Sequence, residues 1–437
     1  MTHQSEVTKV KRGILYCTYN GVCNNTNGIG RQTKTLLGGM DKRRADIESE
    51  FGSFALDVAF PAPGSQTLAY NEDDLLWAQR IVKNMGGRLF GLPSGATSGL
   101  WSVDTWEALS KEAAEAAIRF SKEVDELAVI AVDTPFAGVS RYIADSARPY
   151  GAHIKTVHAL YSTDAIHGTR PTTGRRAWEQ ECIEHVNGSR HAWVADIGQF
   201  FTSHLRDVYG LRTDRLIPFR SSLDLASCDL QACGQEEARR TVAKWGVPTD
   251  RPIVLSFGRA DPIKGVDTLI RALGPLRDQV HLALVAVPYS HSGPILDEYR
   301  RLIAEHGVRA TLVPRFTREL PRALCALEET RIVACTSLGE PLANVPFEVA
   351  MWARNGGPVV VAPACDGFLE QIEDGQTGLF YAPTEAGSLT DAIRRALNYS
   401  IEETRKICQS AHEKVARDRD IVPNLVESLH HLWGRRL

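Results

Sequence analysis

The chain has 437 residues, of which 50 are Lys or Arg and 53 are Asp or Glu, so its formal net charge is −3. This near balance gives no electrostatic reason to expect a nucleic-acid partner, and no basic patch stands out. A hydrophobic content of 43% with 35 glycines and 21 prolines excludes disorder as the main state and is typical of a soluble chain of roughly two or three domains.

The amino terminus and the cysteines indicate a cytoplasmic protein. No apolar stretch reaches the roughly 18 residues that span a bilayer, and MTHQSEVTKVKRG lacks the apolar centre of a signal peptide. The nine cysteines form no Cys-x-x-Cys pair and have no zinc-site spacing, so we expect reduced thiols and no metal site. We expect no stable membrane insertion, and the oligomeric state is left open.

The amino-terminal part, residues 1–216, is predicted to be an α/β domain. Two amphipathic stretches predict helices at Glu107–Asp125 and Gly198–Tyr209. Runs of β-branched and apolar residues predict strands at Gly13–Tyr16, Phe54–Phe60, Leu127–Val132, Ile154–His158 and His191–Val194. Residues 217–250, which contain a proline, a polar SSLD turn and one charged helix, have the composition of a connector.

Residues 251–400 alternate strand and helix patterns six times, which is typical of a parallel sheet covered on both faces. The strands are expected at Ile253–Phe257, Leu282–Val287, Thr311–Val313, Ile332–Cys335, Val359–Val361 and Gly378–Tyr381. The helices are expected at Val266–Leu276, Ile295–Glu305, Arg318–Glu329, Val345–Arg354, Gly367–Ile372 and Ala386–Leu397. Residues 401–437 are expected to form helices that pack along both domains.

The expected fold is therefore α/β, with two doubly wound, Rossmann-like domains that face each other across a deep cleft. In such sheets ligands bind beyond the carboxyl ends of the strands. Functional side chains should therefore follow strands directly.

Glycines follow the first strand. Gly28 and Gly30 precede an amphipathic helix, where free N–H groups and the positive end of the helix dipole attract an anion. The full dinucleotide fingerprint is missing, and a turn that needs glycine only for positive φ explains the residues equally well.

Two cations follow the first strand of the second domain. Arg259 and Lys264 lie at a strand–helix junction, where they can neutralise a diphosphate that gains charge as it leaves. The alternative is a pair of solvated surface charges.

Two carboxylates follow the fourth strand of that domain. Glu340 is expected in the loop and Glu348 about one helical turn further on, so that they can grip the hydroxyls of two sugar rings of one ligand. Pro346 suits the first turn of the helix, and the N–H groups of Leu342, Ala343, Asn344 and Val345 are expected to face the cleft. Alternatively, the carboxylates only favour the helix start electrostatically.

Two further polar residues stand at strand ends of the first domain. His158 is expected to face the cleft, although a lone histidine is as often structural as catalytic. Asp133 is either a ligand contact or a helix cap.

Together these segments resemble the retaining glycosyltransferases of the GT-B fold, specifically the family 4 group. The resemblance covers nearly the whole chain, and its most specific parts are FGRADPIKGVDTLIRAL, EPLANVPFEVAM and GGPVVVAPACDGFLEQIEDGQTGLFY. The spacing Glu-x7-Glu between Glu340 and Glu348 belongs to that family pattern.

The resemblance implies a role for each candidate residue. Arg259 and Lys264 would hold the diphosphate of the donor, and Glu348 would bind its ribose. Glu340 would contact the sugar hydroxyls near C3 and C4, and the amides of Leu342 to Val345 would touch sugar and phosphate. His158 would lie near the reacting centre, and Gly28 near the β-phosphate.

The resemblance also implies the reaction. Family 4 enzymes are thought to retain the anomeric configuration by a front-face reaction, in which the departing phosphate oxygen takes the proton of the acceptor hydroxyl. No protein nucleophile, metal or cofactor is then required, because positioning and cations supply the catalysis. The motifs identify neither the base nor the sugar of the nucleoside-diphosphate sugar.

The chain departs from the family pattern at two places. The usual connector Ile-Pro-Asn-Gly-Val-Asp reads IPFRSSLDL, with Phe219 and Arg220 in place of Asn-Gly. The usual Glu-Pro-Phe-Gly reads Glu340-Pro341-Leu342-Ala343, which narrows the space beside the donor sugar and hints at an unusual donor or acceptor.

The acceptor is expected to bind to the amino-terminal domain, between the segments Phe90–Trp106 and Tyr161–Thr172. Neither segment is a basic amphipathic surface that would dock on anionic lipid, which favours a soluble acceptor. A small metabolite, an aminocyclitol and an oligosaccharide all remain open. Asp133 and Asp164 would suit a cationic amino sugar, but both could equally be turn residues.

Three other functions fit the same scaffold, because a fold does not determine a reaction. They are a nucleotide-sugar epimerase, a phosphorylase, and a catalytically inactive subunit that binds the sugar nucleotide. The sequence shows no evident site for the pyridoxal phosphate of a phosphorylase.

Overall fold

The computed structural model describes residues 11–23, 28–63, 70–96, 101–146, 153–167, 174–288 and 293–434. It divides the chain into two compact units. The N-terminal unit consists of residues 1–224 and 419–437, and the C-terminal unit of residues 225–418. Within the described residues no helix is long and apolar enough to cross a membrane.

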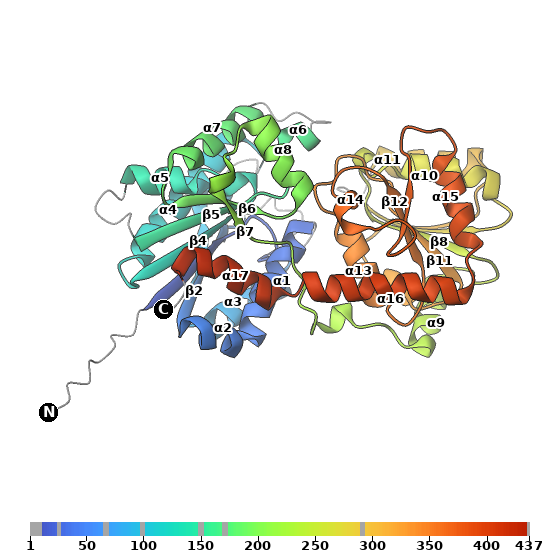
Figure 1. Cartoon of the computed structure of the whole chain (residues 1–437), viewed down its shortest axis with the longest axis horizontal. Coiled ribbons are helices and arrows are strands. Elements are labelled where there is room, and N and C mark those ends of the chain that lie inside the picture. The colour runs from blue at the N-terminus through green and yellow to red at the C-terminus, as the bar shows by residue number, and fades with distance from the viewer. Residues whose placement is uncertain are drawn as a thin grey trace. The chain divides into compact units, whose positions relative to one another are not determined.

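The N-terminal unit contains a seven-stranded sheet in the order β3-β2-β1-β4-β5-β6-β7, and all its strand pairs are parallel (Figure 1). The strands are β1 Arg12–Cys17, β2 Phe54–Pro61, β3 Leu89–Leu92, β4 Glu126–Val132, β5 Ile154–Ala159, β6 Ala192–Asp196 and β7 Leu216–Pro218. The helices are α1 Gly28–Lys42, α2 Arg44–Phe51, α3 Glu72–Asn84, α4 Val103–Phe120, α5 Val139–Ser146, α6 Asp164–His167, α7 Arg175–Gly188, α8 Gln199–Tyr209 and α17 Ile421–Trp433.

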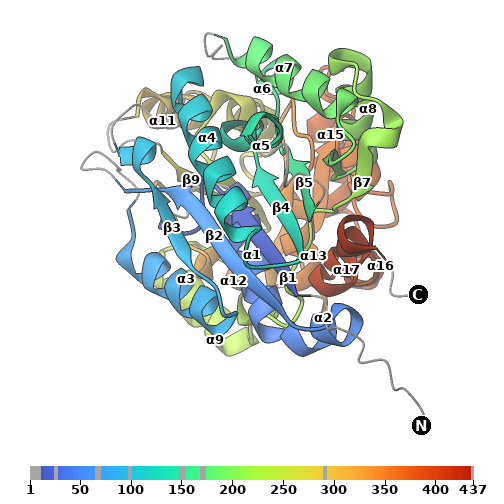
Figure 2. The same ribbon diagram turned by 90° about the vertical axis from the view of Figure 1, so that its left-hand side faces the viewer.

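Alternate residues of β1 are buried in opposite layers, as expected for a sheet covered on both faces. Ile14 and Tyr16 belong to one hydrophobic cluster, which also contains residues of α1 and α17. Leu15 and Cys17 belong to another, which is built largely from α4 and α5 on the other face (Figure 2).

The C-terminal unit contains a six-stranded parallel sheet in the order β10-β9-β8-β11-β12-β13. The strands are β8 Ile253–Arg259, β9 His281–Val287, β10 Ala310–Val313, β11 Thr330–Ala334, β12 Val359–Pro363 and β13 Leu379–Tyr381. The helices are α9 Gln235–Lys244, α10 Val266–Leu273, α11 Pro294–Glu305, α12 Glu319–Cys325, α13 Asn344–Trp352, α14 Phe368–Gln371, α15 Ser388–Leu397 and α16 Ile401–Asp418. The expected fold class, two doubly wound α/β domains, is confirmed.

The unit boundaries differ from those expected from the sequence. Residues 217–250 are not a separate connector, because β7 is the edge strand of the N-terminal sheet and α9 belongs to the C-terminal unit. The terminal segment contributes one helix to each unit, α16 to the C-terminal and α17 to the N-terminal. A backbone bridge between Leu223 and Asp420 joins the outgoing and the returning chain within the N-terminal unit.

Candidate functional site

The order of the C-terminal sheet places its topological switch point between β8 and β11. The sheet continues from β8 through β9 to β10 on one side and from β11 through β12 to β13 on the other. Ligands of doubly wound sheets bind at this point, beyond the carboxyl ends of the two central strands. The loop after β8 carries Lys264, and the loop after β11 carries Glu340.

The loop after β8 forms a short 3₁₀ turn at Pro262–Lys264. The Asp261 side chain caps this turn by accepting a hydrogen bond from the Ile263 N–H at 3.1 Å. The next residue, Gly265, has φ +59°, and a Cβ there would lie 2.3 Å from the Thr336 carbonyl oxygen. Glycine at this position lets the loop after β8 lie directly against the loop after β11.

The two loops are held together by hydrogen bonds and by one ion pair. Thr336 Oγ1 donates to the Lys264 carbonyl at 2.8 Å, and Lys264 Nζ lies 2.5 Å from Glu340 Oε2. Arg259 Nη1 lies 4.0 Å from Asp261 Oδ2. The Lys264, Glu340 and Arg259 side chains remain 23%, 16% and 29% exposed, so a ligand can reach all three of these charged groups.

The loop that contains Glu340 is fixed by hydrogen bonds to two side chains that the sequence analysis missed. One Asp366 carboxylate oxygen accepts hydrogen bonds from the N–H groups of Gly339 and Glu340, at 2.7 and 3.2 Å. The buried Gln371 side chain accepts from the Ala343 N–H at 3.0 Å and donates to its carbonyl at 2.6 Å. The segment CDGFLEQ could have suggested a turn there, but not its partners.

The bond to Gln371 corrects one expectation. The Ala343 N–H is already engaged and does not face a ligand. Leu342, Asn344 and Val345 are half-buried where α13 begins, and α13 lacks a side-chain cap at its N-terminus. Glu348 lies in the second turn of α13, as expected, but is only 4% exposed.

The N-terminal sheet has its switch point between β1 and β4, and Asp133 directly follows β4 there. Asp133 is 2% exposed and has φ +63°, which is rare for a residue other than glycine. Its Oδ1 atom is buried without a hydrogen-bond partner among the described residues. Burial raises the pKa of this carboxyl from 3.8 to about 6.

A buried ion pair on α7 lies beside Asp133. Arg175 Nε donates to Glu179 Oε1 at 2.7 Å, and its Nη2 donates to Thr134 Oγ1 at 3.2 Å. Glu179 also accepts from the backbone N–H of the half-buried Asp164, at 3.0 Å. The structure therefore places both Asp133 and Asp164 next to the Arg175–Glu179 ion pair. Sequence reasoning missed this pair, although the Arg-x3-Glu spacing at a helix start is visible in RRAWE.

The two segments expected to hold the acceptor lie partly outside the described residues, at 97–100 and 168–172. Within the first, Trp101 is 45% exposed, and its ring centroid lies 6.0 Å from that of Tyr19. Arg175 Cζ lies 5.5 Å from the Trp101 ring. An exposed aromatic face thus adjoins the ion pair of α7.

His158 does not face open space, contrary to the expectation from the sequence. It is 2% exposed, and its Nε2 lies 2.8 Å from Ser140 Oγ of α5. Its neighbours Val157 and Ala159 point into the opposite layer, so alternation along β5 directs His158 towards α5. Burial lowers the pKa of His158 to about 3, and the imidazole is neutral near pH 7.

Gly28 also differs from its expected place. α1 begins at Gly28, so both Gly28 and Gly30 lie within its first turn instead of preceding it. Gly28 is exposed, and the first turn of α1 contains no acidic residue. The positive end of this helix is therefore not neutralised by a carboxylate of its own first turn. The described residues contain no group of three or more His, Cys, Asp or Glu side chains that could hold a metal ion.

Comparison with solved structures defines the class of fold. The chain is similar to sucrose-phosphate synthase from Thermosynechococcus elongatus, with a TM-score of 0.72 and 16% identity over 97% of this chain and 98% of that one. It is also similar to Anabaena HepE in complex with UDP-glucose, with a TM-score of 0.69 and 18% identity over 97% and 99%. The fold is the two-domain α/β fold called GT-B.

Sequence comparison adds a match between the C-terminal unit and a family model. Residues 237–415 match the model of the family Glycosyl transferases group 1. The chain is 30% identical to the D-inositol 3-phosphate glycosyltransferase of Corynebacterium aurimucosum over 260 residues. This aligned length covers 56% of this chain and 58% of the relative. The chain thus spans little more than half the length of this curated relative.

Proposed function

We propose that the chain is a glycosyltransferase that moves a sugar from a nucleoside-diphosphate sugar to a hydroxyl group of a soluble acceptor in the cytosol. The observation that carries this proposal is the Lys264–Glu340 pair at the switch point of the C-terminal sheet. It supplies a cation for phosphate and a carboxylate for sugar hydroxyls side by side. Both residues lie within the region that matches the family model.

Arg259 and Lys264 are proposed to hold the diphosphate of the donor. Arg259 is the last residue of β8, Lys264 lies in the loop that follows, and both side chains are partly exposed. Their attraction to the diphosphate grows as negative charge develops on the leaving group, so they stabilise the transition state more than the bound donor. Glu340 is proposed to accept hydrogen bonds from the donor sugar, and Glu348 from the ribose.

The proposed reaction retains the anomeric configuration. The bond between the anomeric carbon and the phosphate oxygen breaks, and a bond to the acceptor oxygen forms on the same face of the sugar. The acceptor proton passes to the departing phosphate oxygen, so atoms and charge balance without a protein nucleophile. The two cations would serve the leaving group in place of a metal ion.

Acceptor recognition is assigned to the N-terminal unit, at the group formed by Asp133, Asp164, Arg175 and Trp101. The unpartnered Oδ1 of Asp133 can accept a hydrogen bond from an acceptor hydroxyl or ammonium group. The exposed Trp101 offers an aromatic face for a ring. Because a relative is named for an inositol phosphate, cyclitols and their phosphates are the first acceptors to test.

Calorimetric titration with UDP-, GDP-, ADP- and dTDP-sugars tests the proposal. One donor should bind saturably, and Glu348→Ala should weaken its affinity. Glu385→Ala, which removes an exposed carboxylate of the same unit, should leave the affinity unchanged. The chosen donor is then incubated with candidate acceptors, and the anomer of the product is read by NMR. Absence of binding by every donor would refute the proposed function.

A further inference from the structure

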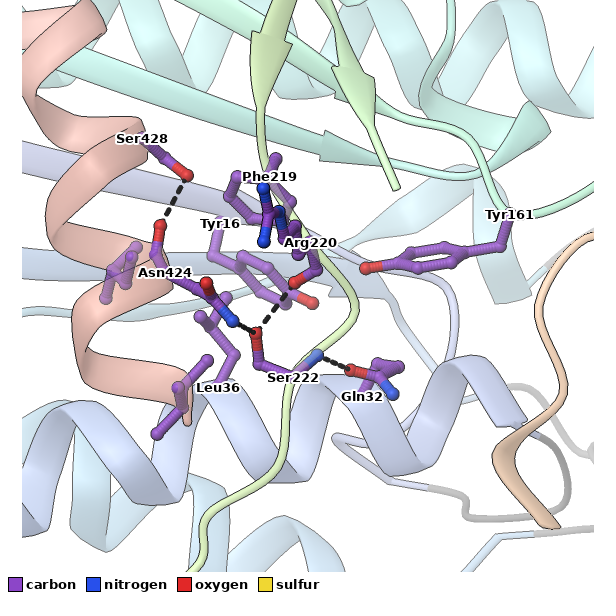
Figure 3. A pocket seen from close by; sticks show the side chains of 11 residues that line it. Tyr16, Gln32, Leu36, Tyr161, Phe219, Arg220, Ser222, Asn424 and Ser428 are labelled. Atoms are coloured by element: carbon purple, nitrogen blue, oxygen red, sulfur yellow. Dashed lines mark hydrogen bonds between the residues drawn. The ribbon is translucent and has the colours of Figure 1, made fainter. Parts of the chain in front are cut away.

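A pocket lies entirely within the N-terminal unit (Figure 3). It is a narrow, half-open depression, and its free space of about 320 Å³ includes the solvent at its mouth. Its wall consists of side chains from β1, α1, α17, the loop after β5 and the segment after β7. These are Tyr16, Gln32, Leu36, Tyr161, Phe219, Arg220, Ser222, Ile421, Asn424, Leu425 and Ser428.

Hydrogen bonds fix one wall of this pocket. The Ser222 N–H donates to Gln32 Oε1 at 3.3 Å, and Asn424 Nδ2 donates to Ser222 Oγ at 2.9 Å. Ser222 Oγ in turn donates to the Arg220 carbonyl at 2.8 Å. Figure 3 shows this chain of bonds running from α1 to α17. The backbone around Arg220 is therefore positioned by both helices.

Two hydrogen-bond donors of the wall have no internal partner. Among the described residues, neither the Arg220 guanidinium nor the Tyr161 hydroxyl makes a hydrogen bond or an ion pair. The Tyr161 hydroxyl points into the pocket from the loop after β5 (Figure 3). Arg220 is the only charged side chain among the described residues that line the pocket, and no carboxylate balances it.

The composition of the wall defines the class of ligand. The exposed Arg220 guanidinium and the half-buried Tyr161 hydroxyl line one pocket, and such donors are suited to phosphate or carboxylate, which accept several hydrogen bonds at once. Leu36, Phe219, Ile421 and Leu425 supply an apolar side to the same space. Phe219 and Arg220 stand where the sequence departs from the usual connector, so the cation and part of the apolar wall come from the residues that replace Asn-Gly.

We propose that this pocket binds the phosphate or carboxylate group of a small molecule, at a site separate from the donor diphosphate site. Phe219 to Ser222 precede the point at which the chain leaves the unit, and Ile421 to Ser428 follow the point at which it returns. A bound anion would therefore link the outgoing and the returning segments. Its source is either the acceptor itself or a separate effector.

Inorganic phosphate is the first probe, titrated at constant ionic strength against potassium chloride while the melting temperature of the full chain is measured. The wild type should show a saturable rise. Arg220→Gln should weaken the apparent affinity at least tenfold, and Tyr161→Phe severalfold. Arg80→Gln, which removes an exposed arginine of α3, is the matched control and should behave as wild type. Equal phosphate affinity in the wild type and Arg220→Gln overturns the proposal.

Lys264→Ala separates this pocket from the donor site. Phosphate binding that survives in Lys264→Ala and is lost in Arg220→Gln supports the pocket, and the reverse pattern overturns it. These binding measurements do not depend on the proposed function, so their failure and the failure of donor binding are distinguishable.

A transfer assay, which does rest on the proposed function, identifies the source of the anion. If phosphate competes with the acceptor and Arg220→Gln raises the acceptor KM, the anionic group belongs to the acceptor. If phosphate changes kcat without competition, and this effect is absent in Arg220→Gln, the ligand is a separate effector. A phosphate effect that is the same in both proteins would overturn the assignment to Arg220.

Discussion

Replacing Asp133 by asparagine should stabilise the N-terminal unit and impair sugar transfer at the same time. Asparagine has the same shape and also tolerates the positive φ of this residue, so the change removes little besides the charge. In the wild type the charged carboxylate is buried with one oxygen unpartnered among the described residues. A carboxylate kept under such conditions is expected to serve function at the expense of stability.

The magnitude follows from the pKa of Asp133. The pKa is about 6 in the folded protein against 3.8 for the free group, and each pKa unit corresponds to about 1.36 kcal/mol. Between these two values the folded chain binds more protons than the unfolded chain, so stability falls as the pH rises from about 4 to about 6. The full cost is about 3 kcal/mol at pH 7.5 and roughly half of that at pH 5.

Hydrogen exchange of peptides from β4 and β5 measures this effect in the N-terminal unit alone. Asp133→Asn should raise the opening free energy by up to about 3 kcal/mol at pH 7.5 and by less at pH 5. Asp366→Asn is the matched control, since Asp366 also has a positive φ but its carboxylate accepts two backbone N–H groups. That substitution should destabilise its own unit. The reasoning would be refuted if Asp133→Asn did not raise the opening free energy, or if the increase were as large at pH 5 as at pH 7.5.

The remaining predictions concern the donor site and His158. Glu348→Ala should weaken donor affinity by about 1.5–3 kcal/mol, the range for hydrogen bonds to a charged group, and unchanged affinity in calorimetry would remove the ribose assignment. Arg259→Ala and Lys264→Ala should lower kcat more than donor affinity, because their contact with the diphosphate strengthens as it leaves; a change in thermal stability alone would identify them as surface charges. The pKa of His158 is lowered to about 3, so His158 should not change its protonation between pH 5 and 9. Ser140→Ala, which removes its hydrogen-bond partner, should therefore leave the pH dependence of the rate unchanged in this range. A bell-shaped profile that moves in this variant would contradict the buried, neutral imidazole. Transfer should persist in excess EDTA, and activity restored only by a divalent ion would show that Arg259 and Lys264 do not suffice.

The regular part of the fold could be predicted from the sequence because it depends on local patterns. The long strands are runs of β-branched and apolar residues, as in Leu127–Val132, which the structure extends by one residue to β4. The strands β3 and β7 were not predicted, since they have four and three residues and lie at the two edges of their sheet. Their extended form depends on pairing with a neighbour and not on composition.

The candidate site was predictable to the extent that it follows strand ends. Arg259, Lys264 and Glu340 lie at the carboxyl ends of β8 and β11, as the pattern indicated. The roles of Asp366 and Gln371 could not be predicted, because they act on residues 26 to 28 positions away through contacts that only the folded chain creates. The burial of His158 likewise depends on α5, which covers that face of β5.

The composition of the N-terminal unit has a consequence for synthesis. α17 supplies Leu425, Leu429 and Trp433 to the same core as β1 and β2, and it is made after the entire C-terminal unit. At about 5–20 residues per second, the roughly 190 intervening residues take about 10 to 40 seconds to translate. During that time the C-terminal unit can fold while the first-made unit still lacks a helix of its core. The unit made first is thus the one completed last, and a nascent chain that is stalled before α17 should expose this apolar face to chaperones.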